Sequence, residues 1–266
     1  MDEQTWHAHR TSFGAVAGAY EQGRPDYPTA ALEWIAGPTP LRVLDLGAGT
    51  GKLTRQLVAA GHEVVAVEPL AEMRAALAAA TPGAMTLDGA AEAIPLSDAS
   101  VDLVVAGQAY HWFVPERAHP EIARVLRPGG RFGVLWNLRD DSEPWVAALN
   151  TLLILDDSAS ASAADEPAVA PYFEPMEGQR FRHEQVLDLD RLIALVASRS
   201  YVITLPEPER AALLADVAEL TRRHHDLAGR PTFTMPYVTQ AYRTTRAQPR
   251  TASRRSSRTP AAGRSG

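Results

Sequence analysis

One stretch of the sequence constrains the fold more than any other: residues 43–54, which read VLDLGAGTGKLT. An apolar run leads into a turn where Gly47, Gly49 and Gly51 stand at alternate positions, and a helix-like segment follows. Glycine adopts backbone conformations that other residues avoid, and it lets a ligand approach the chain closely. A buried strand, a tight turn and a helix are therefore predicted here, with a ligand at the turn.

Strand-like and helix-like segments alternate along the first 140 residues. The strand-like segments are nearly continuous in apolar character, which indicates a parallel sheet covered by helices on both faces. Right-handed crossovers then favour a doubly wound topology, in which ligands bind beyond the carboxyl ends of the strands. We expect strands at residues 42–47, 62–69, 84–89, 100–108 and 131–137, and helices at 29–36, 51–61, 71–81 and 115–130.

The pattern is weaker after Asn137. Residues 178–188 and 233–243 are predicted strands, and residues 208–225 are a predicted amphipathic helix. Residues 156–171 are low in sequence complexity, so we expect a connecting loop there.

Composition excludes several functional classes. The chain has no cysteine, so it can form no disulfide, thiolate metal site or cysteine nucleophile. The eight histidines show no recognisable ligand spacing with acids, so no metal site is expected. No apolar run approaches the roughly 18–20 residues that span a bilayer, and the N-terminus lacks the features of a secretory signal. We therefore expect a cytoplasmic protein that has no membrane partner.

Charge is distributed unevenly along the chain. Residues 243–266 hold seven arginines and no acid, so the rest of the chain carries a net charge of −13, against −6 for the whole. An acidic body argues against a nucleic-acid-binding surface. The basic tail has no apolar periodicity, and we expect it to be disordered.

Three kinds of ligand compete for the glycine turn. A mononucleotide P-loop requires Gly-Lys-Ser/Thr after four intervening residues, but here Leu53 follows Lys52. A dinucleotide site requires Gly-x-Gly-x-x-Gly, whereas this turn reads Gly-x-Gly-x-Gly. The third candidate is a nucleoside that carries an amino acid, which needs close backbone approach but no phosphate-binding lysine.

Several motifs in chain order favour the third candidate. DLGAGTG at residues 45–51 and Glu68 at the end of the next strand are followed by DGAAEAIPLSDASVDLVV, QAYHWF and RVLRPGGRFGVLWN. Together with the flanking YEQGRPDYP, SRSYV and PYVTQAYR, they resemble class I methyltransferases that use S-adenosylmethionine. The resemblance covers about residues 13–140 and is nearest to the methyltransferase type 11 branch, close to trans-aconitate methyltransferase-like enzymes.

The resemblance implies an α/β fold with a doubly wound, mostly parallel sheet of seven strands and an antiparallel C-terminal strand. It also implies a division of the chain. Residues 1–40 would form an N-terminal lid, 41–140 the S-adenosylmethionine-binding core, 141–243 a substrate-side insertion with the last strands of the same domain, and 244–266 the disordered basic tail.

The resemblance further assigns residues to the cofactor. Glu68 would accept hydrogen bonds from both ribose hydroxyls, and Gly47, Gly49 and Gly51 would let the backbone pass close to the ribose and the methionine portion. Asp45 would lie near the methionine amino group or brace the glycine turn, and both roles stay open. The remaining expected contacts are Asp88, Ala91 and Glu92 with adenine, Gln108 with the methionine portion and Arg24 with the cofactor carboxylate.

Fewer residues are assigned to the methyl acceptor. Tyr20, Tyr27 and Tyr110 are expected to line its pocket, whereas Trp112 and Phe113 are expected to pack in the core. An ionised carboxylate needs no base, but a hydroxyl or amine acceptor would benefit from one, and His111 is the candidate general base.

The predicted function is therefore in-line transfer of a methyl group from S-adenosylmethionine to an oxygen or nitrogen atom of a small molecule, with a carboxylate as one candidate. The alternatives are a binding protein of the same fold that has lost catalysis, and an NAD(P)-dependent oxidoreductase.

Overall fold

The computed structural model of the chain describes residues 23–153 and 166–247. Tyr20, most of the predicted lid and residues 248–266 of the predicted tail lie outside the described ranges. Residues 156–165 of the predicted loop lie outside them as well.

Within these two ranges the chain forms one sheet of seven strands in the order β3-β2-β1-β4-β5-β7-β6. Strands β1 to β5 pair in parallel, and β7 is antiparallel to both of its neighbours, β5 and β6. The predicted mostly parallel sheet with an antiparallel C-terminal strand is thus confirmed. The strands are β1 Arg42–Leu46, β2 Glu63–Val67, β3 Met85–Leu87, β4 Val101–Gly107, β5 Leu126–Arg139, β6 Glu177–Leu187 and β7 Phe233–Thr245.

Nine helical segments accompany the sheet in the described part of the chain. They are α3 Thr29–Ala36, α4 Lys52–Ala59, α5 Ala71–Ala80, the 3₁₀ turn η2 Tyr110–Trp112, α6 Pro115–Val125, α7 Pro144–Leu152, α9 Leu189–Ala197, α10 Ser200–Thr204 and α11 Glu207–Arg223. None of these has both the length and the apolar character needed to cross a membrane.

One predicted boundary is wrong. The helix expected to run over residues 115–130 ends at Val125, and Leu126 already has the extended backbone that starts β5. Pro128 has no N–H to give to a helix, and a residue before proline avoids the helical region, so the chain leaves the helix ahead of the Pro-Gly-Gly sequence rather than within it.

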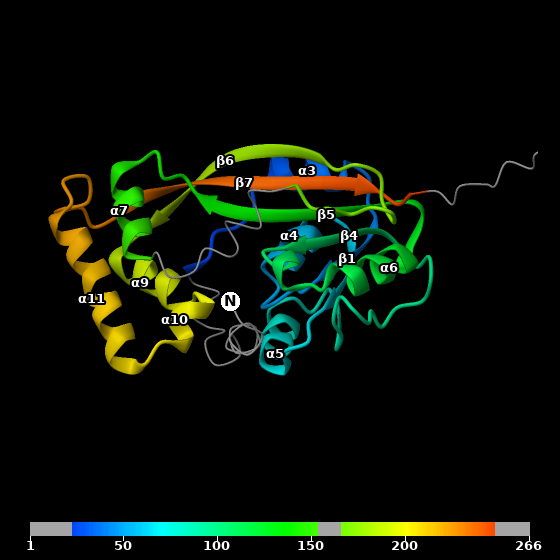
Figure 1. Ribbon diagram of the computed structural model, residues 1–266, viewed down its shortest axis with the longest axis horizontal. Coiled ribbons are helices and arrows are strands. Elements are labelled where there is room, and N and C mark those ends of the chain that lie inside the picture. The colour runs from blue at the N-terminus through cyan, green and yellow to red at the C-terminus, as the bar shows by residue number, and fades with distance from the viewer. Residues whose placement is uncertain (1–22, 154–165, 248–266) are drawn as a thin grey trace, which may run out of the picture.

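Side chains that alternate along the strands fill two cores. Val43 faces a cluster with α3 and α4, whereas Leu44 and Leu46 face a cluster with α6 on the other side of the sheet. A third cluster joins α7, α9, α10 and α11 to the far ends of β6 and β7. In Figure 1 the long strands β5, β7 and β6 cross the molecule and carry this helical group at the opposite end from α6.

The first helix after the glycine turn begins at a glycine that tolerates no side chain. Gly51 caps α4 with φ 87°. A Cβ atom there would lie 2.8 Å from Leu77 Cγ and 3.4 Å from Thr81 Oγ1, so the added atom would push against α5.

We expect Gly51→Ala to lower the free energy of unfolding by about 2–4 kcal/mol, because left-handed strain adds to overpacking. Gly61→Ala is the matched control, since Gly61 has φ 88° but open space where its Cβ would lie. Its cost is expected to be about 1–2 kcal/mol from strain alone. Urea unfolding of both variants measures the difference, and equal costs would show that the contact with α5 is unimportant.

Candidate active site

A cavity opens at the carboxyl ends of the parallel strands, and about 1040 Å³ of space lies within it together with the open solvent at its mouth. Most of its wall follows β1, β2, β3 and β4, and the segment before α3 closes one side. The residues of this cofactor cavity are Arg24, Pro25, Tyr27, Asp45, Gly47–Gly49, Lys52, Leu53, Glu68–Leu70, Met73, Ala90, Ala91, Gly107–Ala109, Trp112, Phe113 and Asn137. Its position at the strand ends is where ligands bind in such sheets.

Glu68 is held rigidly at the end of β2. Its side chain is buried, with 6% of the residue exposed. Oε2 accepts a hydrogen bond from Gly49 N at 2.9 Å, and Oε1 accepts one from Leu70 N at 3.0 Å. The carboxylate therefore joins the glycine turn to the start of α5. A carboxylate oxygen has two lone pairs and can accept more than one hydrogen bond.

Asp45 lies deeper in the same cavity and has one oxygen without a partner. It is 1% exposed, and Oδ2 accepts a hydrogen bond from Thr54 Oγ1 at 2.6 Å. Oδ1 is buried and no donor within the described residues reaches it. Burial raises the pKa of Asp45 to about 7, against the hydrogen bond from Thr54, and the nearby Glu68 raises it further. A cation at Oδ1 would favour the ionised form.

The glycine turn borders open space at Gly49 and close packing at Gly47. Gly47 and Gly49 have φ of 73° and 58°, which only glycine adopts readily. A Cβ at Gly47 would lie 2.7 Å from Ala109 Cβ, whereas one at Gly49 would meet nothing within 4 Å. The backbone at Gly49 thus borders open space beside the Glu68 carboxylate.

The end of β4 forms the opposite wall. Gln108 has a left-handed backbone, φ 54°, and its side-chain amide donates to Asn137 O at 2.9 Å. Such a conformation costs about 1–3 kcal/mol for a residue with a side chain. A Cβ at Gly107 would lie 2.6 Å from the Tyr27 hydroxyl, so this glycine admits the tyrosine to the cavity wall.

Arg24 and Lys52 bring positive charge to the cavity. Arg24 Nε and Nη2 donate to the side chain and backbone oxygens of Ser198, at 3.3 and 3.4 Å. Lys52 Nζ lies 3.1 Å from Asp26 Oδ1. Sequence reasoning missed Lys52, Gly107 and Asn137 as cavity residues.

Seven of the residues predicted to contact the cofactor or the methyl acceptor lie together in the cavity wall, besides Tyr27. These are Arg24, Asp45, Gly47, Gly49, Glu68, Ala91 and Gln108. Trp112 and Phe113, which were expected to pack in the core, line it too. Phe113 does both, since it also packs against the core cluster of α6.

Five other predicted residues lie outside that wall. Gly51 caps α4, and Asp88 is exposed and lies 3.1 Å from Arg74 Nη1. Glu92 accepts a hydrogen bond from Val114 N at 2.8 Å. The Tyr110 hydroxyl lies 3.0 Å from His119 Nε2, and burial raises the pKa of Tyr110 to about 12. The His111 ring lies tilted against Trp112, with 4.7 Å between centroids.

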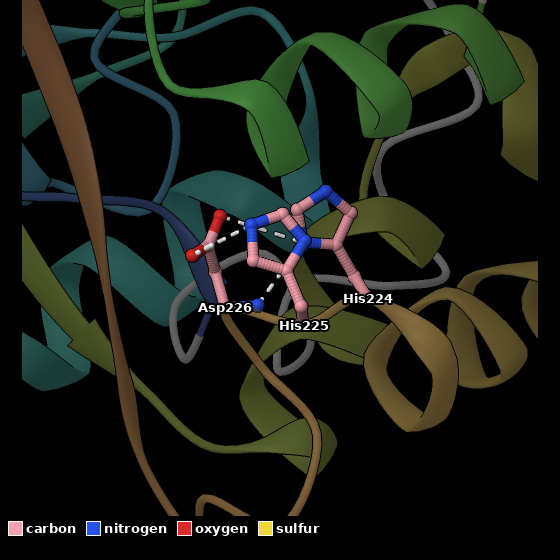
Figure 2. Close-up of side chains that lie close together, drawn as sticks. All are labelled: His224, His225 and Asp226. Atoms are coloured by element: carbon pink, nitrogen blue, oxygen red, sulfur yellow. Dashed lines mark hydrogen bonds and ion pairs between the residues drawn. The ribbon is translucent and has the colours of Figure 1, made fainter.

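A cluster of metal-ligand type lies elsewhere, after α11. His224, His225 and Asp226 bring their ligand atoms within 4.8 Å of one another, as Figure 2 shows. His224 Nδ1 accepts a hydrogen bond from Asp226 N at 3.3 Å. The rings of His224 and His225 stack with 4.7 Å between their centroids. Because the motif spacing of known metal sites is absent, sequence reasoning did not mark this cluster. None of its residues lines the cofactor cavity.

Comparisons with known proteins agree with this arrangement. Residues 44–134 match a methyltransferase domain family. An uncharacterized methyltransferase of Mycobacterium tuberculosis is 46% identical over 234 residues, which is 88% of this chain and 95% of the relative. A malonyl-[acyl-carrier protein] O-methyltransferase of Methylococcus capsulatus is 41% identical over 131 residues, 45% of this chain and 48% of the relative.

A solved methyltransferase structure also matches this chain over most of its length. It is described as a type II methyltransferase from Anaeromyxobacter dehalogenans, with a TM-score of 0.62 and 26% identity, and the match covers 84% of this chain and 97% of the other. The trans-aconitate branch is not among these findings. From its sheet order, its matched domain and its relatives, this chain belongs to the class I S-adenosylmethionine-dependent methyltransferases.

Proposed function

We propose that this methyltransferase binds S-adenosylmethionine in the cofactor cavity and methylates an oxygen or nitrogen atom of a small molecule. One observation carries the proposal: the buried Glu68 carboxylate is fixed beside the open space at Gly49 and across from the unpartnered Asp45 Oδ1. A ribose diol next to an amino acid ammonium would satisfy both acids at once.

The chain's residues fit the cofactor in a definite order. Glu68 would hold the ribose hydroxyls, and Ala91 would border the adenine. Asp45 Oδ1 would accept a hydrogen bond from the ammonium group, and Arg24 would pair with the carboxylate of the methionine portion. Bound S-adenosylmethionine supplies a methyl group already activated on a sulfonium centre.

The protein's own contribution is mainly position and exclusion of water. Gln108 and Asn137 hold the end of β4 against β5, and the ring of Tyr27 covers the cavity beside them. Fixing two reactants in line is worth up to about 7–11 kcal/mol of the barrier in favourable cases. Trp112, which lines the cavity, presents an aromatic ring that would attract a sulfonium cation.

We favour an oxygen acceptor that is already ionised. His111 lies outside the cavity wall, so a base would have to act from there through water. A carboxylate needs no base at all. The partial relative from Methylococcus capsulatus is an O-methyltransferase, and its match is limited to about half of each chain.

Methyl-labelled S-adenosylmethionine tests this function. The protein is incubated with the label and a filtered extract of small metabolites, beside separate protein and nucleic acid fractions. We expect label in the small-molecule fraction, matched by released S-adenosylhomocysteine, and a product that loses its methyl group in mild alkali as an ester does. Label in the macromolecular fractions would contradict the acceptor class, and bound cofactor with no transfer would contradict catalysis.

A further inference from the structure

A row of polar side chains continues from the cofactor cavity along the β5–β7–β6 part of the sheet. Asn137 lines the cavity, and Arg139 follows two residues later on the same face of β5. In the sheet register Arg139 stands opposite Tyr237 of β7, and Tyr237 stands opposite His183 of β6. The row therefore leads from the expected methyl-transfer position toward the helices α7, α9 and α10.

Tyr237 is the buried centre of this row. Only 3% of it is exposed, and among the described residues its hydroxyl has no hydrogen-bond partner. A buried hydroxyl without a partner is costly, so such groups normally face water or a ligand. Burial raises the pKa of Tyr237 to about 12, although the charges of Arg139, Arg24 and Arg199 act in the opposite direction.

Two residues of β6 near Tyr237 also have a buried polar atom without a hydrogen-bond partner among the described residues. The His183 ring stacks on Tyr237 at 5.4 Å between centroids, and its buried Nε2 lacks a hydrogen-bond partner in the described part of the chain. The same is true of Gln185 Oε1, two residues along β6. Both residues line a second cavity that shares Arg24, Tyr27 and Lys52 with the cofactor cavity. Two unsatisfied polar side chains therefore line a cavity whose wall also includes Arg24.

The arginines near Tyr237 are held in place from three different elements. Arg139 Nε donates to Asn150 Oδ1 of α7 at 2.6 Å. Arg24 bonds Ser198, the residue just before Arg199, so the connection between α9 and α10 lies at the border of the cofactor cavity. Arg199 lies over the Tyr201 ring at 5.8 Å.

We propose that Arg139, Arg199 and the Tyr237 hydroxyl form an anion subsite that binds an oxyanion group of the methyl acceptor, a carboxylate or a phosphate. Guanidinium groups match such oxyanions with paired donors, and a buried hydroxyl adds a further donor. Arg24 lines the cofactor cavity, and its charge also reaches Tyr237. The acceptor then extends from the anion subsite to the cavity, anchored by one group and methylated at another. This inference rests on the proposed function.

The test titrates small anions into the full chain saturated with S-adenosylhomocysteine. Malonate and inorganic phosphate are the probes, and neutral malonamide is their control. We expect one or both anions to bind and malonamide not to, with the better anion identifying the acceptor's group. Arg139→Gln and Arg199→Gln are each expected to weaken anion binding at least about tenfold. Arg180→Gln is the matched control, because Arg180 is exposed and alternates to the other face of β6.

Tyr237→Phe separates a ligand-binding role from a structural one. Because its hydroxyl has no partner, we expect the variant to melt at the same temperature or higher while anion affinity falls about threefold to tenfold. Unchanged affinity with a lower melting temperature would overturn the proposal, as would failure of both anions to bind a protein that binds S-adenosylhomocysteine normally. Failure to bind S-adenosylhomocysteine itself would instead contradict the proposed function.

Discussion

Replacing Glu68 with alanine is expected to weaken the binding of S-adenosylhomocysteine by about 100-fold or more. Two hydrogen bonds to a charged acceptor contribute about 1.5–3 kcal/mol each, and every 1.4 kcal/mol is a factor of ten in affinity. The variant also removes the acceptor of Gly49 N and Leu70 N, so the glycine turn loses its tie to the start of α5. Both effects act on the same binding site.

Glu63→Ala is the matched control for this loss. Glu63 lies on the same strand as Glu68, but its side chain is exposed and pairs with Arg42 at the other end of β2. We expect the control to bind S-adenosylhomocysteine as the wild type does in a calorimetric titration. Binding by Glu68→Ala within threefold of wild type would remove the ribose role from Glu68.

Asp45→Asn is expected to become more stable relative to the wild type as the pH rises from about 4 to 7 in the absence of ligand. Burial raises the pKa of Asp45 to about 7, so the folded protein holds a proton that the unfolded chain releases near pH 4. The protonated Asp45 therefore stabilises the folded wild-type protein fully below about pH 4. This contribution to the free energy of unfolding is lost as the pH rises through the folded pKa of about 7. The full loss of unfolding free energy in the wild type corresponds to roughly 4 kcal/mol. The Asp45→Asn variant does not show this loss, because asparagine does not titrate.

Urea unfolding of both proteins from pH 4.5 to pH 8 measures this difference. Asp102→Asn provides a contrast of opposite sign. Despite partial burial, hydrogen bonds from Arg42 N and Arg127 hold the pKa of Asp102 below its usual value. Asp102 therefore stabilises the fold above the unfolded pKa, and its contribution is lost as the pH falls. If the difference in free energy of unfolding between the wild type and Asp45→Asn stays constant between pH 5 and pH 8, then ionised Asp45 is not destabilising.

The first half of the fold follows from the sequence because local signals agree there. The apolar run before Gly47 leads to β1, and the helix expected at 29–36 matches α3 residue for residue. The second half gave weaker signals. Helices α7, α9 and α10 were not predicted, because their apolar residues pack into a cluster with β6 and β7 that only the folded chain brings together.

The site was predictable where strand ends fix the side chains, and less so beyond them. Asp45 and Glu68 stand in or directly after strands, and the sheet order alone brings them together. The residues after Gln108 are different. They form the 3₁₀ turn η2, in which neighbouring side chains point in different directions, so Trp112 faces the cavity while Tyr110 packs toward His119. No pattern in the sequence distinguishes those directions.

The central claim is that the cofactor cavity binds S-adenosylmethionine, and calorimetric titration of the wild-type protein tests it most directly. S-adenosylmethionine, S-adenosylhomocysteine and NAD⁺ are titrated separately under the same conditions. We expect one molecule of either adenosyl compound to bind per chain with a dissociation constant of the order of micromolar, about 8 kcal/mol of binding free energy, and NAD⁺ not to bind. Binding of NAD⁺ in their place, or of none of the three, would contradict the account.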